Sequence, residues 1–193
     1  DLSARIPLKG GKVLSDSPVS LQLEIDQLDA AKLAAALGKT FPVQGLLSAN
    51  GNFSGTLETL TGSLTAEATR IKPTAAGGPP TEPATMKLTA LVKQGNLALE
   101  GTATQRPLQT VTLSASLPLD LPALLENPQK AKTLPLSAQV KMPASSLAFL
   151  PAWVPALRTV AGTAAMDFTV SGTVGAPVWK GGATVSASQV TFG

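Results

Sequence analysis

The chain has 193 residues and a net charge of +3, with 44% hydrophobic and 14% charged residues. This composition excludes a disordered polar chain, and the small net charge without a run of Lys or Arg argues against nucleic-acid binding. The absence of His and Cys excludes a Ser-His-Asp triad, a cysteine nucleophile and a Cys/His zinc site. The 12 acidic residues are scattered along the sequence, so we expect no enzyme activity, no metal and no cofactor.

The sequence predicts one domain over 1–193. No run of 18 apolar residues is present, and the sequence therefore predicts no membrane-spanning helix. The chain starts at Asp1 inside a strand-like run, with neither an initiator Met nor a signal-peptide pattern. We therefore expect the domain to be a fragment of a longer repeat protein.

An internal repeat predicts how the chain is organised. Two Ser-Gly-Thr steps, at 54–56 and 171–173, lie 117 positions apart. Sliding the sequence by that distance also superposes SPVSLQLEID on LPLSAQVKMP, and both runs carry apolar residues at every second position. Repeat units follow at about 18–71 and 135–190. Each unit predicts a strand, a short helix, a strand, a Gly-Thr step and another strand.

The first unit contains the predicted helix with the clearer boundaries. Asp26 or Asp29 can cap its start, because a carboxylate accepts hydrogen bonds from the free N–H groups of a first helical turn. Gly38 is placed to end it. Its apolar residues recur near helical spacing: Leu28, Ala31, Leu33 and Leu37.

The segment between the units predicts a loop and more strands. Residues 72–85 hold four prolines and two glycines, which predicts a flexible loop inserted within the single domain. Inserted hairpins are expected over 84–117, with a turn at Gln94-Gly95-Asn96. A proline-bounded short helix is predicted within 118–130.

The helix of the second unit is expected to be shorter or broken, because Pro151 and Pro155 remove backbone donors. Its bulky residues, Phe149, Leu150, Trp153 and Val154, suit either an ordinary packed helix or a plug over an apolar interior. After this helix, a Gly-Ala-Pro turn at 175–177 is expected to reverse the chain.

Alternation in nearly every predicted strand gives a sheet with one apolar face and one face of Ser, Thr, Gln and Lys. About a dozen strands are expected. The apolar face can be hidden by a second sheet in a sandwich, by closure into a barrel, or by bending into a trough. Alternation alone leaves these three arrangements open, and the close packing of ordinary protein interiors favours the sandwich over the trough.

One family shows the same order of elements. Residues 135–193 resemble the TamB and AsmA-like superfamily, with the sequence PLSAQVKMPASSLAFLPAWVPALRTVAGTAAMDFTVSGTVGAPVWKGGATVSASQVTFG. Residues 18–71 show the resemblance more weakly, because they lack the Ala-Pro that follows the Gly-Thr step. The resemblance covers somewhat over half of the chain. It implies a mainly β fold: an elongated, curved, mostly antiparallel sheet forming a hydrophobic trough (β-taco-like), with a few short helices.

The resemblance also implies a function. Proteins of this superfamily are envelope proteins of diderm bacteria, anchored in the inner membrane and reaching through the periplasm. They are linked to phospholipid transport and, with an Omp85-type partner, to outer-membrane protein assembly. This chain would be a periplasmic internal segment. Phospholipid or another hydrophobic cargo would be its partner, and an Omp85-type protein would bind other parts of the parent chain.

We expect a hydrophobic groove for lipid, lined by Leu21, Leu23, Ile25, Leu47, Phe53, Leu88, Leu99, Leu113, Val140, Met166, Phe168 and Val170. A bulge in any strand would change which residues belong to it. The alternatives are a scaffold that pairs its open sheet edge with strands of outer-membrane proteins, and a structural β-sandwich adhesin module. Both terminal strands are expected to be bare edges, which permits edge-to-edge self-association.

Overall fold

The computed structural model describes residues 1–5, 8–9, 12–13, 16–36, 38, 43–73, 82–154 and 156–192. The strands are β1 Leu2–Arg5, β2 Leu8–Lys9, β3 Lys12–Val13, β4 Val19–Asp29, β5 Val43–Gly55, β6 Thr61–Pro73, β7 Ala84–Lys93, β8 Asn96–Thr104, β9 Val111–Pro118, β10 Ser137–Ser146, β11 Leu157–Thr173 and β12 Ala176–Phe192. The helices are α1 Ala30–Ala36, α2 Leu121–Glu126, the 3₁₀ helix η1 Pro128–Thr133 and α3 Leu150–Trp153.

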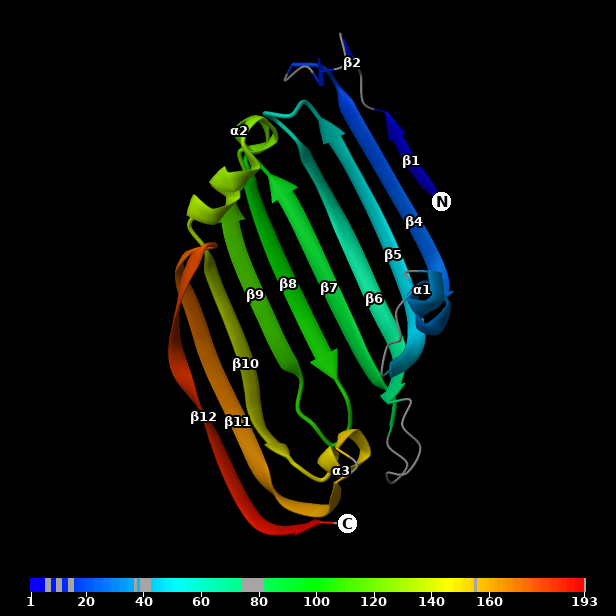
Figure 1. Cartoon of the computed structure of the whole chain (residues 1–193), viewed down its shortest axis with the longest axis vertical. Helices are drawn as coiled ribbons and strands as arrows, with labels where there is room; N and C mark the ends of the chain where they lie inside the picture. The colour runs from blue at the N-terminus through cyan, green and yellow to red at the C-terminus, as the bar shows by residue number, and fades with distance from the viewer. Residues whose placement is uncertain are drawn as a thin grey trace.

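Ten strands form one antiparallel sheet in the order β1-β4-β5-β6-β7-β8-β9-β10-β11-β12, and β2 and β3 form a separate two-stranded ribbon. From β4 onward each strand pairs with the next strand along the chain, which gives an up-and-down meander (Figure 1). The sheet remains open, with β1 and β12 at its edges. The predicted mainly β, antiparallel fold with a few short helices is confirmed.

The pairing registers separate apolar from polar residues across the sheet. Residues directly opposite each other on neighbouring strands point to the same face. One row of paired residues, from β4 to β12, is entirely apolar: Ile25, Ala49, Ala66, Leu88, Gly101, Leu113, Val140, Phe168 and Gly181. The adjacent row is entirely polar: Glu24, Asn50, Thr65, Thr89, Glu100, Ser114, Gln139, Thr169 and Lys180. We call the two sides the apolar face and the polar face.

Bulges keep the apolar residues on one face where their spacing changes from two to three. The register shifts between Ile25 and Leu28 in β4, and between Ala68 and Ile71 in β6. Gln27 and Arg70, inside these two shifts, have φ angles of 45° and 55°. The extra residue is absorbed there, so Leu28 and Ile71 return to the apolar face. The bulges therefore preserve the face instead of inverting it.

The predicted hairpin between 84 and 104 is confirmed. Lys93 pairs with Asn96, so β7 and β8 are joined by the two residues Gln94 and Gly95. Both have positive φ, 51° and 69°, as a type I′ turn requires. The twist of this turn matches that of the flanking strands, which fixes the register of the central part of the sheet.

The loop predicted over 72–85 is shorter than expected. Lys72 and Pro73 still belong to β6, and Ala84 already begins β7. Residues 74–81 lie outside the described residues. Backbone pairing with β5 extends β6 as far as Pro73. Pro is tolerated there because β7 pairs with β6 only as far as Ile71, which leaves this end of β6 at an edge.

The turn in the second unit lies one step earlier than the predicted Gly-Ala-Pro turn. Thr173 pairs with Ala176, so the chain reverses at Val174 and Gly175, and Pro177 belongs to β12. The amide nitrogen of Ala176 donates a hydrogen bond to Oγ1 of Thr173 over 3.2 Å. Proline is accommodated in β12 because this strand forms the edge of the sheet.

The helices start and end for local reasons. Of the two predicted caps of α1, Asp29 is the one used, because its Oδ1 accepts hydrogen bonds from the amides of Ala31 at 2.7 Å and Lys32 at 3.2 Å. Oδ1 of Asp120 caps α2 by accepting from the amide of Ala123 at 3.1 Å. Helix α3 has only 4 residues, as the prolines predict. Leu37 and Pro155, assigned to the two predicted helices, lie outside the described residues.

Replacing Asp29 by Ala is expected to lower the free energy of unfolding by about 1 kcal/mol, because the first turn of α1 loses its cap. Urea denaturation measures the loss. Asp26→Ala is the matched control, since Asp26 is exposed and accepts no hydrogen bond within the described part of the chain. Equal losses from both variants would contradict the assignment of Asp29 as the cap.

The two repeat segments share their sequence of elements. β4, α1, β5 and β6 occur in the same order as β10, α3, β11 and β12. The register shift between Ile25 and Leu28 has its counterpart between Met142 and Ser145, 117 positions later. Gly55 and Gly172, also 117 apart, have φ angles of 130° and 95° at the ends of β5 and β11. The repeat therefore extends to the position of a bulge.

Candidate functional site

All of the predicted groove residues lie on the apolar face. Ile25, Leu88, Leu113, Val140 and Phe168 belong to the apolar row itself. The others stand two or four positions from a row residue on the same strand, and therefore share its face: Leu21, Leu23, Leu47, Phe53, Leu99, Met166 and Val170. Seven strands contribute to the set: β4, β5, β7, β8, β9, β10 and β11.

A cavity of about 590 Å³ opens on the apolar face between β4 and β9. It contains four predicted residues, Ile25, Leu47, Leu88 and Leu113. The remaining predicted residues lie on the same face outside it. Its volume falls within the range of small-molecule sites in proteins.

Sequence reasoning missed several residues of this cavity. Leu28, Met86 and Val111 line it from the strands. Alternation along β7 and β9 could have added Met86 and Val111 to the set, whereas Leu28 lies three positions from Ile25 and reaches this face only through the bulge. Leu33 lines it from α1. No strand pattern signals Leu33, because its position depends on how α1 folds back against β4 and β5.

The floor of the cavity consists of small residues between larger ones. Ala49, Ala66, Ala68, Gly101 and Ala103 lie on β5, β6 and β8, to either side of the larger Met86 and Leu88 of β7. Leu28 and Leu33 stand at one side, and Val111 and Leu113 at the other. Small side chains on β5, β6 and β8 therefore leave space on both sides of Met86 and Leu88.

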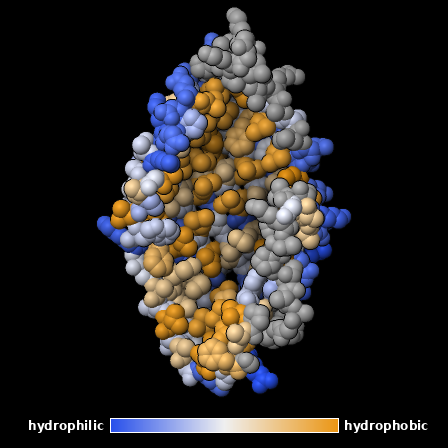
Figure 2. All heavy atoms as spheres, viewed as in Figure 1, coloured by the Kyte–Doolittle hydropathy of each residue, from blue (hydrophilic) through white to orange (hydrophobic). Residues whose placement is uncertain are grey.

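The described residues leave this face largely uncovered. Met86 is 52% exposed and Leu88 is 38% exposed, although both lie in the middle of the sheet. Among the described elements, extended packing between strands is confined to neighbours in the sheet, and α1 and α3 are the helices that pack appreciably on strands. Figure 2 shows apolar side chains gathered in a hollowed strip along this face, with hydrophilic residues at its margins. The buried hydrophobic residues are correspondingly few and mainly small, such as Ala30, Ala34 and Ala90.

A buried polar cluster fixes α3 at one end of the apolar face. Nε1 of Trp153 donates to Oε1 of Gln105 at 3.2 Å, and Nε2 of Gln105 donates to the carbonyl oxygen of Glu82 at 3.1 Å. Oγ of Ser145 accepts from the amide of Gln109 at 3.0 Å. Gln105 and Ser145 are 7% and 2% exposed, and every partner they need is present. The cluster ties the segment between β8 and β9 to α3, and α1 lies toward the same end of the strands (Figure 1).

The polar face carries neutral side chains interspersed with charged ones, among them Glu24, Glu100 and Lys180. Asp167 accepts a hydrogen bond from Nε2 of Gln139 at 2.9 Å and lies 4.0 Å from Nζ of Lys141. This ion pair is exposed and contributes little to stability. Leu91, which is 47% exposed, is an apolar exception on this face, since it pairs with Ser63 and Ala98.

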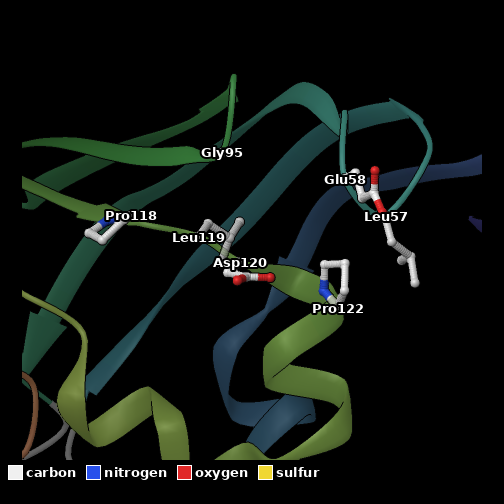
Figure 3. Close-up of a pocket in the computed structure, with 7 residues that line it drawn as sticks. All are labelled: Leu57, Glu58, Gly95, Pro118, Leu119, Asp120 and Pro122. Carbon is white, nitrogen blue, oxygen red and sulfur yellow. The ribbon is translucent and has the colours of Figure 1, made fainter. Parts of the chain in front are cut away.

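A smaller cavity of about 290 Å³ lies at the opposite end, beside α2 (Figure 3). Glu58 approaches it from the turn between β5 and β6, and Asp120 from the segment before α2. The Asp120 carboxylate is already engaged as the helix cap. None of the predicted groove residues lines this cavity.

Within the described residues, no group of three or more acidic side chains is arranged to hold a metal ion. None of the helices described is long and apolar enough to cross a bilayer. No family model matches the chain, and comparison with curated proteins and with solved structures also gives no match.

Proposed function

We propose that this chain binds the acyl chains of phospholipid on its apolar face, as a segment along which lipid moves. The observation that supports the proposal most directly is the apolar row, continuous over nine strands, with the 590 Å³ cavity over its part from β4 to β9. Monomeric soluble proteins rarely expose a contiguous apolar surface of this extent without a binding role.

Burial energetics support a lipid cargo. Each methylene removed from water is worth about 0.8 kcal/mol, so a two-chain phospholipid crossing water alone faces a cost of roughly 20 kcal/mol or more. The apolar face offers Leu, Val, Met and Ala contacts at many equivalent positions. Such contacts are non-directional, so they reduce the cost of transfer while allowing the lipid to slide.

The resemblance to the TamB and AsmA-like superfamily supplies the cellular setting of the proposal. In that setting the segment lies in the periplasm, and the cargo moves between the inner and outer membranes. The adhesin alternative requires a second sheet over the apolar face. The described residues form only the small β2–β3 ribbon besides the main sheet.

Native mass spectrometry of detergent-free protein tests the proposal. We expect adducts with the masses of phospholipids, which survive gentle ionisation and are released by collisional activation. After delipidation, the protein should take up phospholipid again from vesicles. A chain without adducts that also takes up no lipid would contradict the proposal.

A further inference from the structure

The apolar cavity has a floor two strands wide over β5 and β6. In the apolar row, Ala49 and Ala66 lie side by side between two larger residues, Ile25 on β4 and Leu88 on β7. Ala68 continues the small residues of β6 on the same face, and all five line the cavity. Because alanine ends at its Cβ, the larger side chains stand as walls on either side. We call Ala49, Ala66 and Ala68 the alanine floor.

The space on the other side of Leu88 is narrower. A single residue, Gly101, separates Leu88 from Leu113 in the row. A Cβ at Gly101 would lie 3.4 Å from Cδ1 of Leu88 and 3.3 Å from Cβ of Leu113. The two leucines therefore already reach over Gly101 at contact distance. Since the Leu88 side chain extends toward β8, it leaves the space above Ala66 free.

Large side chains limit the alanine floor along the strands. A Cβ at Gly51 would lie 2.9 Å from Cδ1 of Leu64, and a Cβ at Gly62 would lie 2.7 Å from Cδ1 of Phe53. In both pairs the large residue stands directly opposite the glycine on the neighbouring strand. Each large side chain therefore covers both strands. The open stretch lies between Leu64 and Leu33 of α1, which lines the cavity at its other end.

The distance between the two walls suits two hydrocarbon chains. Neighbouring strands lie about 4.8 Å apart, so the backbones of β4 and β7 are separated by roughly 14 Å. Carbon atoms in contact lie about 4 Å apart, so the three contacts from Ile25 to one chain, to a second chain and to Leu88 take up roughly 12 Å. A single chain would leave a gap beside it, and the atoms lining such a gap lose their attractive contacts.

The volume of the cavity agrees with this width. A methylene group takes up about as much space as a water molecule in the liquid, roughly 30 Å³. A cavity of about 590 Å³ therefore holds about 20 methylenes. Part of this volume lies over β8, so each of two chains on the alanine floor occupies a segment of up to about ten methylenes.

We infer that the alanine floor seats the two acyl chains of one lipid molecule side by side, one over β5 and one over β6. Ala49 and Ala66 then determine specificity for two-chain over one-chain lipids, because their small size sets the width of the seat. This inference rests on the proposed function, to which it adds the number of acyl chains and the residues that select it.

The test uses the delipidated full chain and phosphatidylcholine vesicles that contain a minor fraction of lysophosphatidylcholine, which has the same headgroup and one acyl chain. After incubation the protein is separated from the vesicles, and mass spectrometry measures both lipids bound to it. In Ala66→Leu the side chain gains three carbons and takes the place of one acyl chain. We expect the ratio of bound two-chain to bound one-chain lipid to fall at least tenfold, while bound one-chain lipid changes by less than threefold.

Two further variants make the comparison specific. Ala49→Leu narrows the seat from β5 and should reproduce the change in the ratio, whether or not Ala66→Leu folds. Ala183→Leu adds the same atoms to the apolar face outside the cavity, at an exposed position opposite Met166, and should leave the ratio unchanged. Circular dichroism checks that each variant is folded.

The outcomes separate this inference from the proposed function. Equal losses of both lipids in Ala66→Leu and Ala49→Leu would mean that the cavity seats one chain, and an unchanged ratio would mean that the chains lie elsewhere. Either result would overturn the inference while the unmodified protein still binds lipid. An unmodified protein that takes up neither lipid would overturn both.

Discussion

A Leu88→Asp variant is expected to lose most of its bound phospholipid while keeping the fold. Leu88 lies in the apolar row and lines the 590 Å³ cavity. A carboxylate there removes contact with two or three methylenes of an acyl chain, worth about 2 kcal/mol, or roughly a 30-fold loss of affinity. Because Leu88 is 38% exposed in the protein alone, the new charge can reach water and the sheet should still form. Lipid uptake from fluorescent vesicles measures the change.

Leu91→Asp is the matched control. Leu91 lies on the same strand, has similar exposure and points to the polar face. We expect its lipid uptake to remain within about twofold of the unmodified protein, since no acyl chain contacts that face. Equal losses from Leu88→Asp and Leu91→Asp would show that lipid does not lie on the apolar face. Unfolding of Leu88→Asp alone would show that Leu88 belongs to a filled core.

A Gly62→Ala variant is expected to lose about 3 kcal/mol of unfolding free energy. Gly62 has a φ of 157°, and a Cβ there would lie 2.6 Å from Cα of Phe53 as well as against the carbonyl oxygen of Asn52. These atoms are backbone, so relief requires β5 and β6 to separate. A strained backbone position costs roughly 1–3 kcal/mol, and steric displacement adds to it. Chemical denaturation measures the loss.

Gly182→Ala provides the comparison. A Cβ at Gly182 would meet no atom within 4 Å, so its effect should stay within about 0.5 kcal/mol. Similar losses for both variants would mean that general flexibility at glycine, rather than the close approach of β5 and β6, determines the effect.

The faces of the strands were predictable from the sequence because side chains alternate along any β-strand. Leu21, Leu88 and Phe168 were assigned to one side before any pairing was known, and the registers place them together. The hairpin at Gln94-Gly95 and the capping role of an Asp before α1 depend on equally local chemistry.

Other features depended on contacts distant in sequence. The bulge after Ile25 and the choice of Asp29 over Asp26 arise where β4 must pair with β5 and then turn into α1. Leu33 enters the cavity only because α1 packs against the sheet. The end of β11 at Thr173, before the Ala-Pro pair, is fixed by its pairing with β12.

The sequence by itself determined that the sheet has one apolar face, since alternation is a property of each strand alone. Only the tertiary structure decided how far the described residues cover that face. The hydrophobic effect favours any layer that covers the apolar face, without preferring one kind. A second sheet, closure of the sheet into a barrel, or a bound ligand is therefore equally compatible with the alternation of apolar residues. The meander uses nearly every strand to extend a single sheet, which leaves few residues of the described chain to cover it.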